Sequence, residues 1–154
     1  MDHRQERLKE LGIELPSVSP PLGSYVPARI SGNYIYVSGQ LPLQEGKLMV
    51  TGKVGDEVSV EDASRAARMD AVKAIADIKN QIGDLSKVQK IVKITGYVAS
   101  APGFYNQANV LNGASDLFFE VFGEEGKHAR AAVGVAGLPM NSPVEVAVLA
   151  ELTP

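Results

Sequence analysis

Two charged residues stand inside apolar runs near the C-terminal end of the sequence. Arg130 lies in Ala129-Arg130-Ala131-Ala132-Val133, and Glu145 lies in Val144-Glu145-Val146-Ala147-Val148. Burying a single guanidinium or carboxylate without a partner costs several kcal/mol, so each must be paired or must meet a ligand. The small neighbours of Arg130 leave its planar fork free to bind an anion through two parallel hydrogen bonds. Arg130 and Glu145 are therefore the candidate site.

Each residue also has an ordinary structural explanation. Arg130 can reach solvent from the start of its strand, and Glu145 can be a solvated charge at a sheet edge. The two strands are consecutive, so we expect them to pair antiparallel. A tight connection over 139–143 would then set Arg130 opposite residue 152, and the two charges need not touch within one chain. A site shared between subunits would bring them together.

Three further polar residues are candidates. Tyr25 and Ser38 lie at the ends of the first predicted hairpin, and Asn112 borders the apolar face of a predicted helix. Taken singly, a half-buried ring or a hydroxyl bonded to the backbone explains Tyr25 and Ser38. A satisfied amide at a packing interface explains Asn112 equally well.

Other chemistries fail on the inventory of residues. The chain has no cysteine and two histidines, His3 and His128, which leaves neither a thiol site nor a two-histidine metal motif. A serine-nucleophile elbow and a phosphate-binding glycine loop are missing from the sequence. We expect no metal. The net charge of -3 argues against a nucleic-acid partner. No run approaches the roughly 20 apolar residues of a membrane span, so we expect a soluble cytoplasmic protein without a membrane partner.

The strands that hold these residues follow from apolar patterning. Short β-rich runs occur at 24–30, 34–37, 88–100, 129–138 and 144–152, with a weaker one at 47–54. Ser31-Gly32-Asn33 suits a tight turn between the first two.

Helical spacing governs two longer segments. In 59–83, Ser59 and Asp62 form a capping box before a run of small and branched apolar residues. In 103–122 one helical face carries Ala108, Leu111, Ser115, Phe118, Phe119 and Phe122. Asn112-Gly113 is a hairpin signal, but the surrounding pattern favours a helix. The order of elements predicts an α+β fold, a mixed β-sheet with two helices packed on one face.

The N-terminal region is expected to add to this domain. Residues 3–11 predict a short charged helix that ends at Gly12, and Pro16, Pro20 and Pro21 predict an extended linker. We divide the chain into this helix and proline-rich linker (1–21) and one domain (22–154). A chain of 154 residues is long enough for a single core.

The last strand also indicates self-association. Val144, Val146 and Val148 load one face, while Ala147 and Leu149 load the other. Two helices can cover only one face of the sheet, so the second apolar face predicts an oligomer.

Several of these motifs together resemble the Rid (YjgF) family of reactive intermediate deaminases, some of whose members are labelled L-PSP endoribonuclease. The resemblance covers about residues 22–150 and is strongest in 129–139 with Val144-Glu145-Val146. Val37-Ser38-Gly39-Gln40-Leu41-Pro42 is similar to a turn of that family, and Tyr25 and Asn112 fall at positions that match its pattern.

The resemblance implies a chorismate-mutase-like α+β fold and a homotrimer with clefts between subunits. It also implies hydrolysis of 2-imino and enamine acids to a 2-keto acid and ammonia. Arg130 would hold the substrate carboxylate and Glu145 would orient the attacking water, with Tyr25, Ser38, Gly39 and Asn112 lining the cleft. Because an imine carbon is already electrophilic, placing water suffices and no cofactor is expected.

The sequence departs from the family pattern where many members carry a cysteine two residues after the arginine, since Ala132 stands there. The proline expected before Tyr25 is Ser24, and the N-terminal helix is additional. These departures suggest a longer subgroup. Two alternatives remain: a non-catalytic trimer that binds small carboxylates, and a ribonuclease or translation inhibitor, which the acidic balance opposes.

Overall fold

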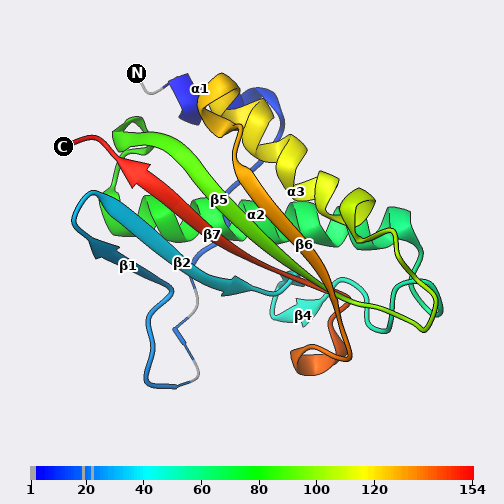
Figure 1. Cartoon of the computed structure of the whole chain (residues 1–154). Helices are drawn as coiled ribbons and strands as arrows, with labels where there is room; N and C mark the ends of the chain where they lie inside the picture. Colours follow the sequence, from blue (N-terminus) through cyan, green and yellow to red (C-terminus); the bar gives the residue numbers. More distant parts are fainter. Residues whose placement is uncertain (1–2, 19, 22) are drawn as a thin grey trace.

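The computed structural model describes residues 3–18, 20–21 and 23–154 of the chain. One layer is a mixed sheet of five strands, and two long helices form a second layer behind it (Figure 1). The helices and 3-10 turns are α1 (His3–Glu10), α2 (Val60–Ile82), η1 (Leu85–Lys87), α3 (Gln107–Phe122), η2 (Gly123–Gly126) and η3 (Pro139–Asn141). The strands are β1 (Ala28–Ser31), β2 (Tyr34–Gln40), β3 (Leu43–Gln44), β4 (Lys47–Leu48), β5 (Val88–Ala99), β6 (Ala129–Val135) and β7 (Val144–Leu152). The predicted α+β class is confirmed.

The strand order of the main sheet is β1-β2-β7-β5-β6. β7 pairs antiparallel with both β2 and β5, whereas β6 pairs parallel with β5. The expected antiparallel pair of the strands that carry Arg130 and Glu145 is therefore wrong, because β5 lies between them. β5, α3 and β6 form a β-α-β unit, and such a crossover returns the chain parallel to the strand that it left.

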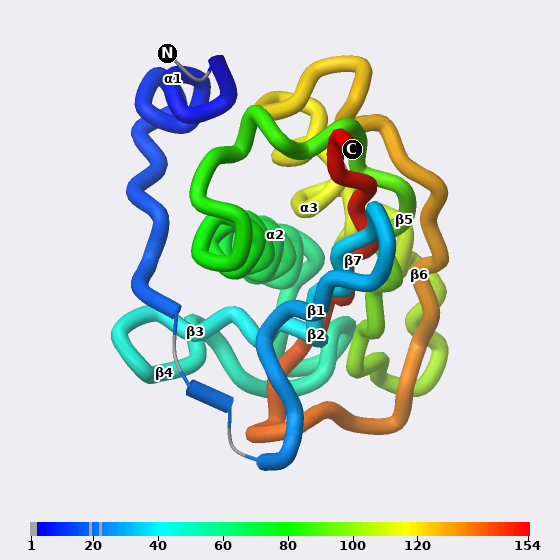
Figure 2. Tube along the Cα trace, turned by 90° about the vertical axis from the view of Figure 1, so that its left-hand side faces the viewer, coloured from blue at the N-terminus to red at the C-terminus, as the bar shows by residue number. Residues whose placement is uncertain are grey.

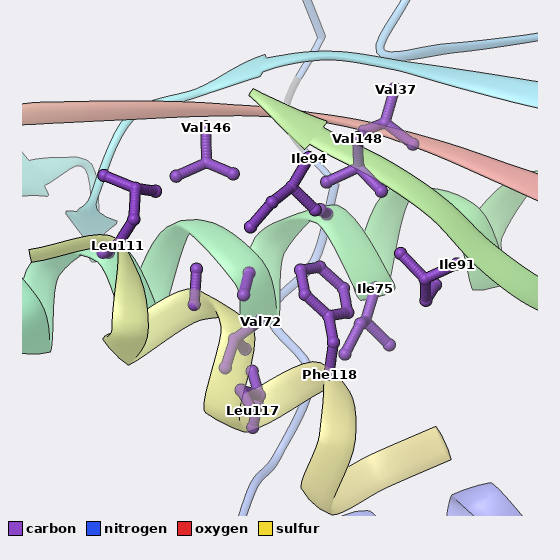
Figure 3. Packing of buried hydrophobic residues seen from close by; sticks show 14 of the residues in the cluster. Val37, Val72, Ile75, Ile91, Ile94, Leu111, Leu117, Phe118, Val146 and Val148 are labelled. Carbon is purple, nitrogen blue, oxygen red and sulfur yellow. The ribbon is translucent and has the colours of Figure 1, made fainter. Parts of the chain in front are cut away.

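The core fills the space between the sheet and the two long helices. Ile94 and Val148 from the sheet meet Val72 and Ile75 of α2 and Phe118 of α3 (Figure 3). α2 begins where predicted, because the Ser59 hydroxyl accepts a hydrogen bond from the Asp62 backbone N–H at 3.1 Å. The helical face of alanines in α2 lets the helix approach the sheet closely.

The Asn112-Gly113 pair lies inside α3, as the helical pattern predicted. Gly113 is required by packing, since a Cβ there would lie 2.0 Å from the Ser64 carbonyl oxygen of α2. Most residues of the predicted apolar face of α3 are buried or half-buried, but the prediction is wrong for two of them. Ala108 and Phe119 are exposed, and the Lys127 ammonium lies 5.3 Å from the centre of the Phe119 ring.

The uncovered face of the sheet carries side chains that alternate with those of the core. Tyr36 and Val133 are exposed there, while Tyr97 and Leu149 are half-buried.

The expected weak strand over 47–54 is confined to Lys47–Leu48, and Val54 makes only isolated bridges. Gly46, in the turn between β3 and β4, has a φ of 80°, which lies in the left-handed region that favours glycine.

The N-terminal helix α1 docks beside the far end of α3 (Figure 1). Leu8 is completely buried in the core cluster. The Arg4 guanidinium donates to the Leu85 carbonyl oxygen at 2.9 Å and pairs with Glu125. Beyond α1 the chain crosses α2 toward β3 and β4 (Figure 2). Residues 1, 2 and 19 of the predicted N-terminal helix and linker lie outside the described residues, as does residue 22 at the start of the predicted domain.

The packing at Gly113 gives a stability prediction. Gly113→Ala should lower the free energy of unfolding by about 1–3 kcal/mol, because the forced separation of α2 and α3 outweighs the gain of about 1 kcal/mol in helix propensity. Urea unfolding measures the change. Gly137→Ala is the control, since a Cβ at Gly137 meets nothing within 4 Å and its stability should stay near wild type. A Gly113→Ala protein more stable than wild type would contradict the close packing.

Candidate functional site

Arg130 lies on β6, at the edge of the sheet, and its side chain points to the helix side. The register places Arg130 beside Ile94, and Ile94 beside Val148, both of which are buried against the helices. Directly paired residues of neighbouring strands point to the same face. Because β6 is an edge strand, the guanidinium meets α3 and remains exposed.

Two side chains of α3 hold one end of this guanidinium. Arg130 Nη1 donates to Asn112 Oδ1 at 2.8 Å and to Ser115 Oγ at 3.2 Å. Both hydrogens of Nη1 are thereby used. Among the described residues none accepts a hydrogen bond from Nε or Nη2 of Arg130, and these two groups form the edge of the fork that binds a carboxylate through two parallel bonds.

His128 extends this network on the same side of the sheet. Its Nδ1 lies 2.7 Å from the Gly126 carbonyl oxygen, and its Nε2 lies 2.8 Å from Ser115 Oγ. A carbonyl oxygen only accepts, so Nδ1 carries a hydrogen. In the neutral ring Nε2 then accepts from the serine hydroxyl. Burial lowers the pKa of His128, and the nearby Arg130 charge adds to this effect. Both effects favour the neutral imidazole, and the hydrogen bond to the Gly126 carbonyl oxygen opposes them.

Glu145 lies on the opposite face of the sheet from Arg130. Along β7, Val144, Val146 and Val148 are buried against the helices, and Glu145 alternates with them. The register sets Glu145 beside Tyr97, on the uncovered face. Arg130 and Glu145 therefore do not come together within one chain.

The carboxylate of Glu145 packs over Gly39. β2 contains a bulge between Val37 and Gln40, where its register with β7 shifts. A Cβ at Gly39 would lie 2.3 Å from Glu145 Oε2, so only glycine leaves room for the carboxylate. Glu145 is half-buried, and this burial raises its pKa. A carboxylate with a raised pKa is a better proton acceptor for a bound water.

Tyr25, Ser38 and Gly39 gather around a cavity of about 280 Å³ at the other side of this bulge. The Tyr25 side chain is 55% exposed. Ser38 Oγ donates to the Val26 carbonyl oxygen at 2.6 Å, so its hydroxyl hydrogen is engaged with the backbone. The proline-rich segment covers the cavity, through Pro16, Pro20 and Pro21.

Three charged residues of α2 lie on one helical face near this cavity. Asp70 is completely buried, and among the described residues nothing forms a hydrogen bond with its carboxyl oxygens. Burial raises the pKa of Asp70 well above its usual range, against the opposing charge of Lys73. Burial also raises the pKa of Asp77 to about 6 and lowers that of Lys73. Lys73 Nζ donates to the Leu41 carbonyl oxygen at 2.8 Å.

The predicted site residues thus form two groups. Arg130 and Asn112 make one, on the helix side of β6. Tyr25, Ser38 and Gly39 make the other, at the cavity beside the bulge of β2, and Glu145 packs over Gly39 without lining that cavity. Sequence reasoning did not assign Ser115 or His128 to the site. Their spacing was a usable signal, because Ser115 follows Asn112 by three residues on a helix and His128 precedes Arg130 by two.

Two features bear on other kinds of site. Within the described ranges, no three His, Cys, Asp or Glu side chains are grouped to hold a metal ion. None of the helices in the described part of the chain has the length and apolar character needed to cross a membrane.

Comparison with known proteins gives a family match over nearly the whole chain. A family model described as "YjgF/chorismate_mutase-like, putative endoribonuclease" matches residues 5–152. The match begins within α1, upstream of the resemblance over 22–150 seen in the sequence.

Individual proteins are also similar to this chain over most of its length. The Trypanosoma cruzi protein TCP17 is 44% identical, covering 94% of this chain and 91% of its own length. The crystal structure of Atu1372 from Agrobacterium tumefaciens superposes with a TM-score of 0.91 at 50% identity, covering 98% of this chain and 94% of that one. A 2-iminobutanoate/2-iminopropanoate deaminase of Dermatophagoides farinae is 29% identical, covering 87% of this chain and 90% of its own length.

Asp70 gives a prediction for stability against pH. Its pKa is higher in the folded chain than in the unfolded one, so the folded state binds more protons and stability falls as pH rises through the folded pKa. Asp70→Asn keeps the shape without the charge. It should raise the free energy of unfolding at pH 8 by about 1 kcal/mol or more, and this gain should shrink toward pH 4.

Urea unfolding at pH 4, 6 and 8 measures the effect. Asp116→Asn, at an exposed position of α3, is the matched control and should follow wild type at every pH. An Asp70→Asn protein less stable than wild type at pH 8 would mean that Asp70 is ionised and stabilised by Lys73.

Proposed function

Because the chain belongs to the YjgF/chorismate-mutase-like family, we propose that it is a hydrolytic deaminase of 2-imino and enamine acids. The observation that carries the proposal is the held guanidinium of Arg130. Its Nη1 is fixed by Asn112 and Ser115, and among the described residues none accepts from its Nε and Nη2, which can therefore bind a carboxylate. The 2-iminobutanoate/2-iminopropanoate deaminase among the relatives supports this class of substrate.

The proposed reaction needs an oriented substrate and a placed water. Arg130 binds the carboxylate of the imino acid and thereby fixes the imine carbon. Glu145 accepts a proton from water as the water oxygen attacks that carbon, which forms a C–O bond and moves the C=N electron pair onto nitrogen. Glu145 passes that proton to the nitrogen. The proton of the new hydroxyl then moves to the nitrogen as the C=O bond forms and the C–N bond breaks, which gives a 2-keto acid and ammonia. The raised pKa of Glu145 suits it to this exchange of protons.

The site so described is completed by a second subunit. Arg130 and Glu145 lie on opposite faces of the sheet, and the uncovered face carries Tyr36, Tyr97, Val133 and Leu149. We propose that this face packs against other copies in a homotrimer, which places Arg130 and Asn112 of one subunit across a cleft from Glu145 and Gly39 of the next. Sedimentation of a monomer at micromolar concentration would contradict this assembly.

The experiment that tests the activity is ammonia release from imines. An amino-acid oxidase generates imines in place from several amino acids, and semicarbazide competes with the protein for them. Faster loss of imine with wild type supports deamination and ranks the substrates. No acceleration across the panel would overturn it in favour of a carboxylate-binding trimer.

Arg130→Ala should lower kcat/KM by about tenfold or more, since truncating one partner of a charge pair costs about 2–5 kcal/mol. Glu145→Gln should abolish hydrolysis and leave the affinity for a 2-keto acid nearly intact. The same imine assay measures both. Lys47→Ala, on the short strand β4, is the control and should keep wild-type rates. Wild-type activity in Arg130→Ala would remove Arg130 from the mechanism.

A shared site makes a second prediction, for mixed subunits. Arg130→Ala and Glu145→Gln subunits, co-expressed in equal amounts, should recover up to about one quarter of wild-type activity, because random assembly joins an intact Arg130 to an intact Glu145 in that share of clefts. Each variant alone is the control. If the mixture stays as inactive as its parts while mixed trimers form, Arg130 and Glu145 do not act in one cleft.

A further inference from the structure

Ser115 and His128 form a chain of hydrogen bonds that ends on Arg130. The guanidinium donates to Ser115 Oγ at 3.2 Å, the hydroxyl lies 2.8 Å from His128 Nε2, and His128 Nδ1 lies 2.7 Å from the Gly126 carbonyl oxygen. Since the last oxygen can only accept, His128 Nδ1 carries a hydrogen. When the ring is neutral, Nε2 accepts from the Ser115 hydroxyl, and every donor along the chain points the same way.

The imidazole is also fixed by packing. Its ring meets the edge of Phe118 on α3, with the ring centres 5.9 Å apart. The hydrogen bonds of the ring to Gly126 and Ser115, together with this contact, hold His128 in one orientation. His128 in turn sets the rotation of the Ser115 hydroxyl. The lone pairs of Ser115 Oγ are thereby turned to the guanidinium.

Protonation of His128 would reverse this arrangement. A hydrogen on Nε2 would point at Ser115 Oγ, which already accepts a hydrogen from Arg130 Nη1. The serine hydroxyl would lose its acceptor, and two positive charges would share one oxygen between them. Ser115 Oγ has two lone pairs and can accept both hydrogens, but repulsion between the two cations would weaken its hold on the guanidinium.

Arg130 is the charged residue that affects the pKa of His128, and the other charged residues of η2 and α3 named below are paired with one another or with other side chains. Lys127 and Glu124 of the adjoining turn pair with each other at 3.0 Å, and Glu125 pairs with Arg4. Glu120 of α3 pairs with Arg68 at 2.9 Å. Arg130 is the charge that lowers the pKa of His128, in addition to burial.

We propose that Ser115 and neutral His128 are positioning residues for the Arg130 guanidinium, so that anion binding at Arg130 is weakened when His128 is protonated. The inference rests on the proposed role of Arg130 as the carboxylate-binding group, and it adds a regulation by pH to that role. Neither residue touches the substrate; both act through Arg130.

The first test needs neither ligand nor activity. Nuclear magnetic resonance of the ring nitrogens reports the tautomer and the pKa of His128, and His3→Gln leaves it as the single histidine. We expect the Nδ1–H tautomer and a pKa below the ordinary value of about 6.5. Arg130→Ala should raise that pKa, because it removes the neighbouring charge. An Nε2–H tautomer, or a pKa unchanged in Arg130→Ala, would overturn the proposal.

The second test measures binding of pyruvate, a small 2-keto acid, by isothermal titration calorimetry. At pH 8, Ser115→Ala and His128→Phe should bind about three- to tenfold more weakly than wild type, as expected for loss of a hydrogen bond that orients a charged group. Ser115→Thr keeps the hydroxyl and should recover most of the affinity. Asp116→Ala, exposed on the same helix, is the control and should bind as wild type does.

The pH dependence separates positioning from loss of structure. Wild-type affinity should fall as pH is lowered through the pKa of His128, whereas in His128→Phe it should be weak and flat over the same range. Wild-type affinity in His128→Phe with an unchanged pH profile would overturn the proposal. If pyruvate binds as expected and no imine is hydrolysed, the deaminase proposal fails while the positioning roles stand. If pyruvate does not bind to wild type, the role of Arg130 fails, and the regulation of binding fails with it.

Discussion

The two long helices cover only one face of the sheet, and the rest of the molecule is arranged around this asymmetry. β7 occupies the middle of the sheet and presents its residues in turn to the helices and to the open face. Val144, Val146 and Val148 belong to the core because α2 and α3 lie beneath them. The same alternation sends Glu145 to the other side. One period-two pattern thus separates the hydrophobic core from the Glu145 carboxylate.

The position of β6 at the edge of the sheet keeps the Arg130 guanidinium out of the apolar core. A guanidinium on the helix side of a central strand would be buried among apolar groups, at a large cost in desolvation. On the edge strand it passes beside α3 instead, where Asn112 and Ser115 supply neutral oxygen acceptors. The charge is therefore oriented by dipoles and left without a carboxylate partner among the residues that contact it. A guanidinium so held keeps its attraction for an anion from outside the chain.

Much of this could be predicted from the sequence, and what could not has a physical cause. α2 and its cap at Ser59 follow from local spacing and a single hydrogen bond, and both were predicted correctly. The pairing of β6 was not, because strand order depends on competition among distant segments, and β5 hydrogen-bonds along both of its edges. Arg130 and Glu145 stood out as charges among apolar neighbours. Ser115 and His128 did not, since their roles depend on how α3 lies across β6.

The docking of α1 has a consequence for how the chain folds. Leu8 is buried in the common core, and Arg4 contacts residues 81 to 121 positions further along the sequence. Contacts of such long range close large loops, which is slow and entropically costly. During synthesis α1 must therefore wait until η2 has emerged before it can form all of its contacts. Until then Leu8 is an exposed apolar side chain on an unanchored helix.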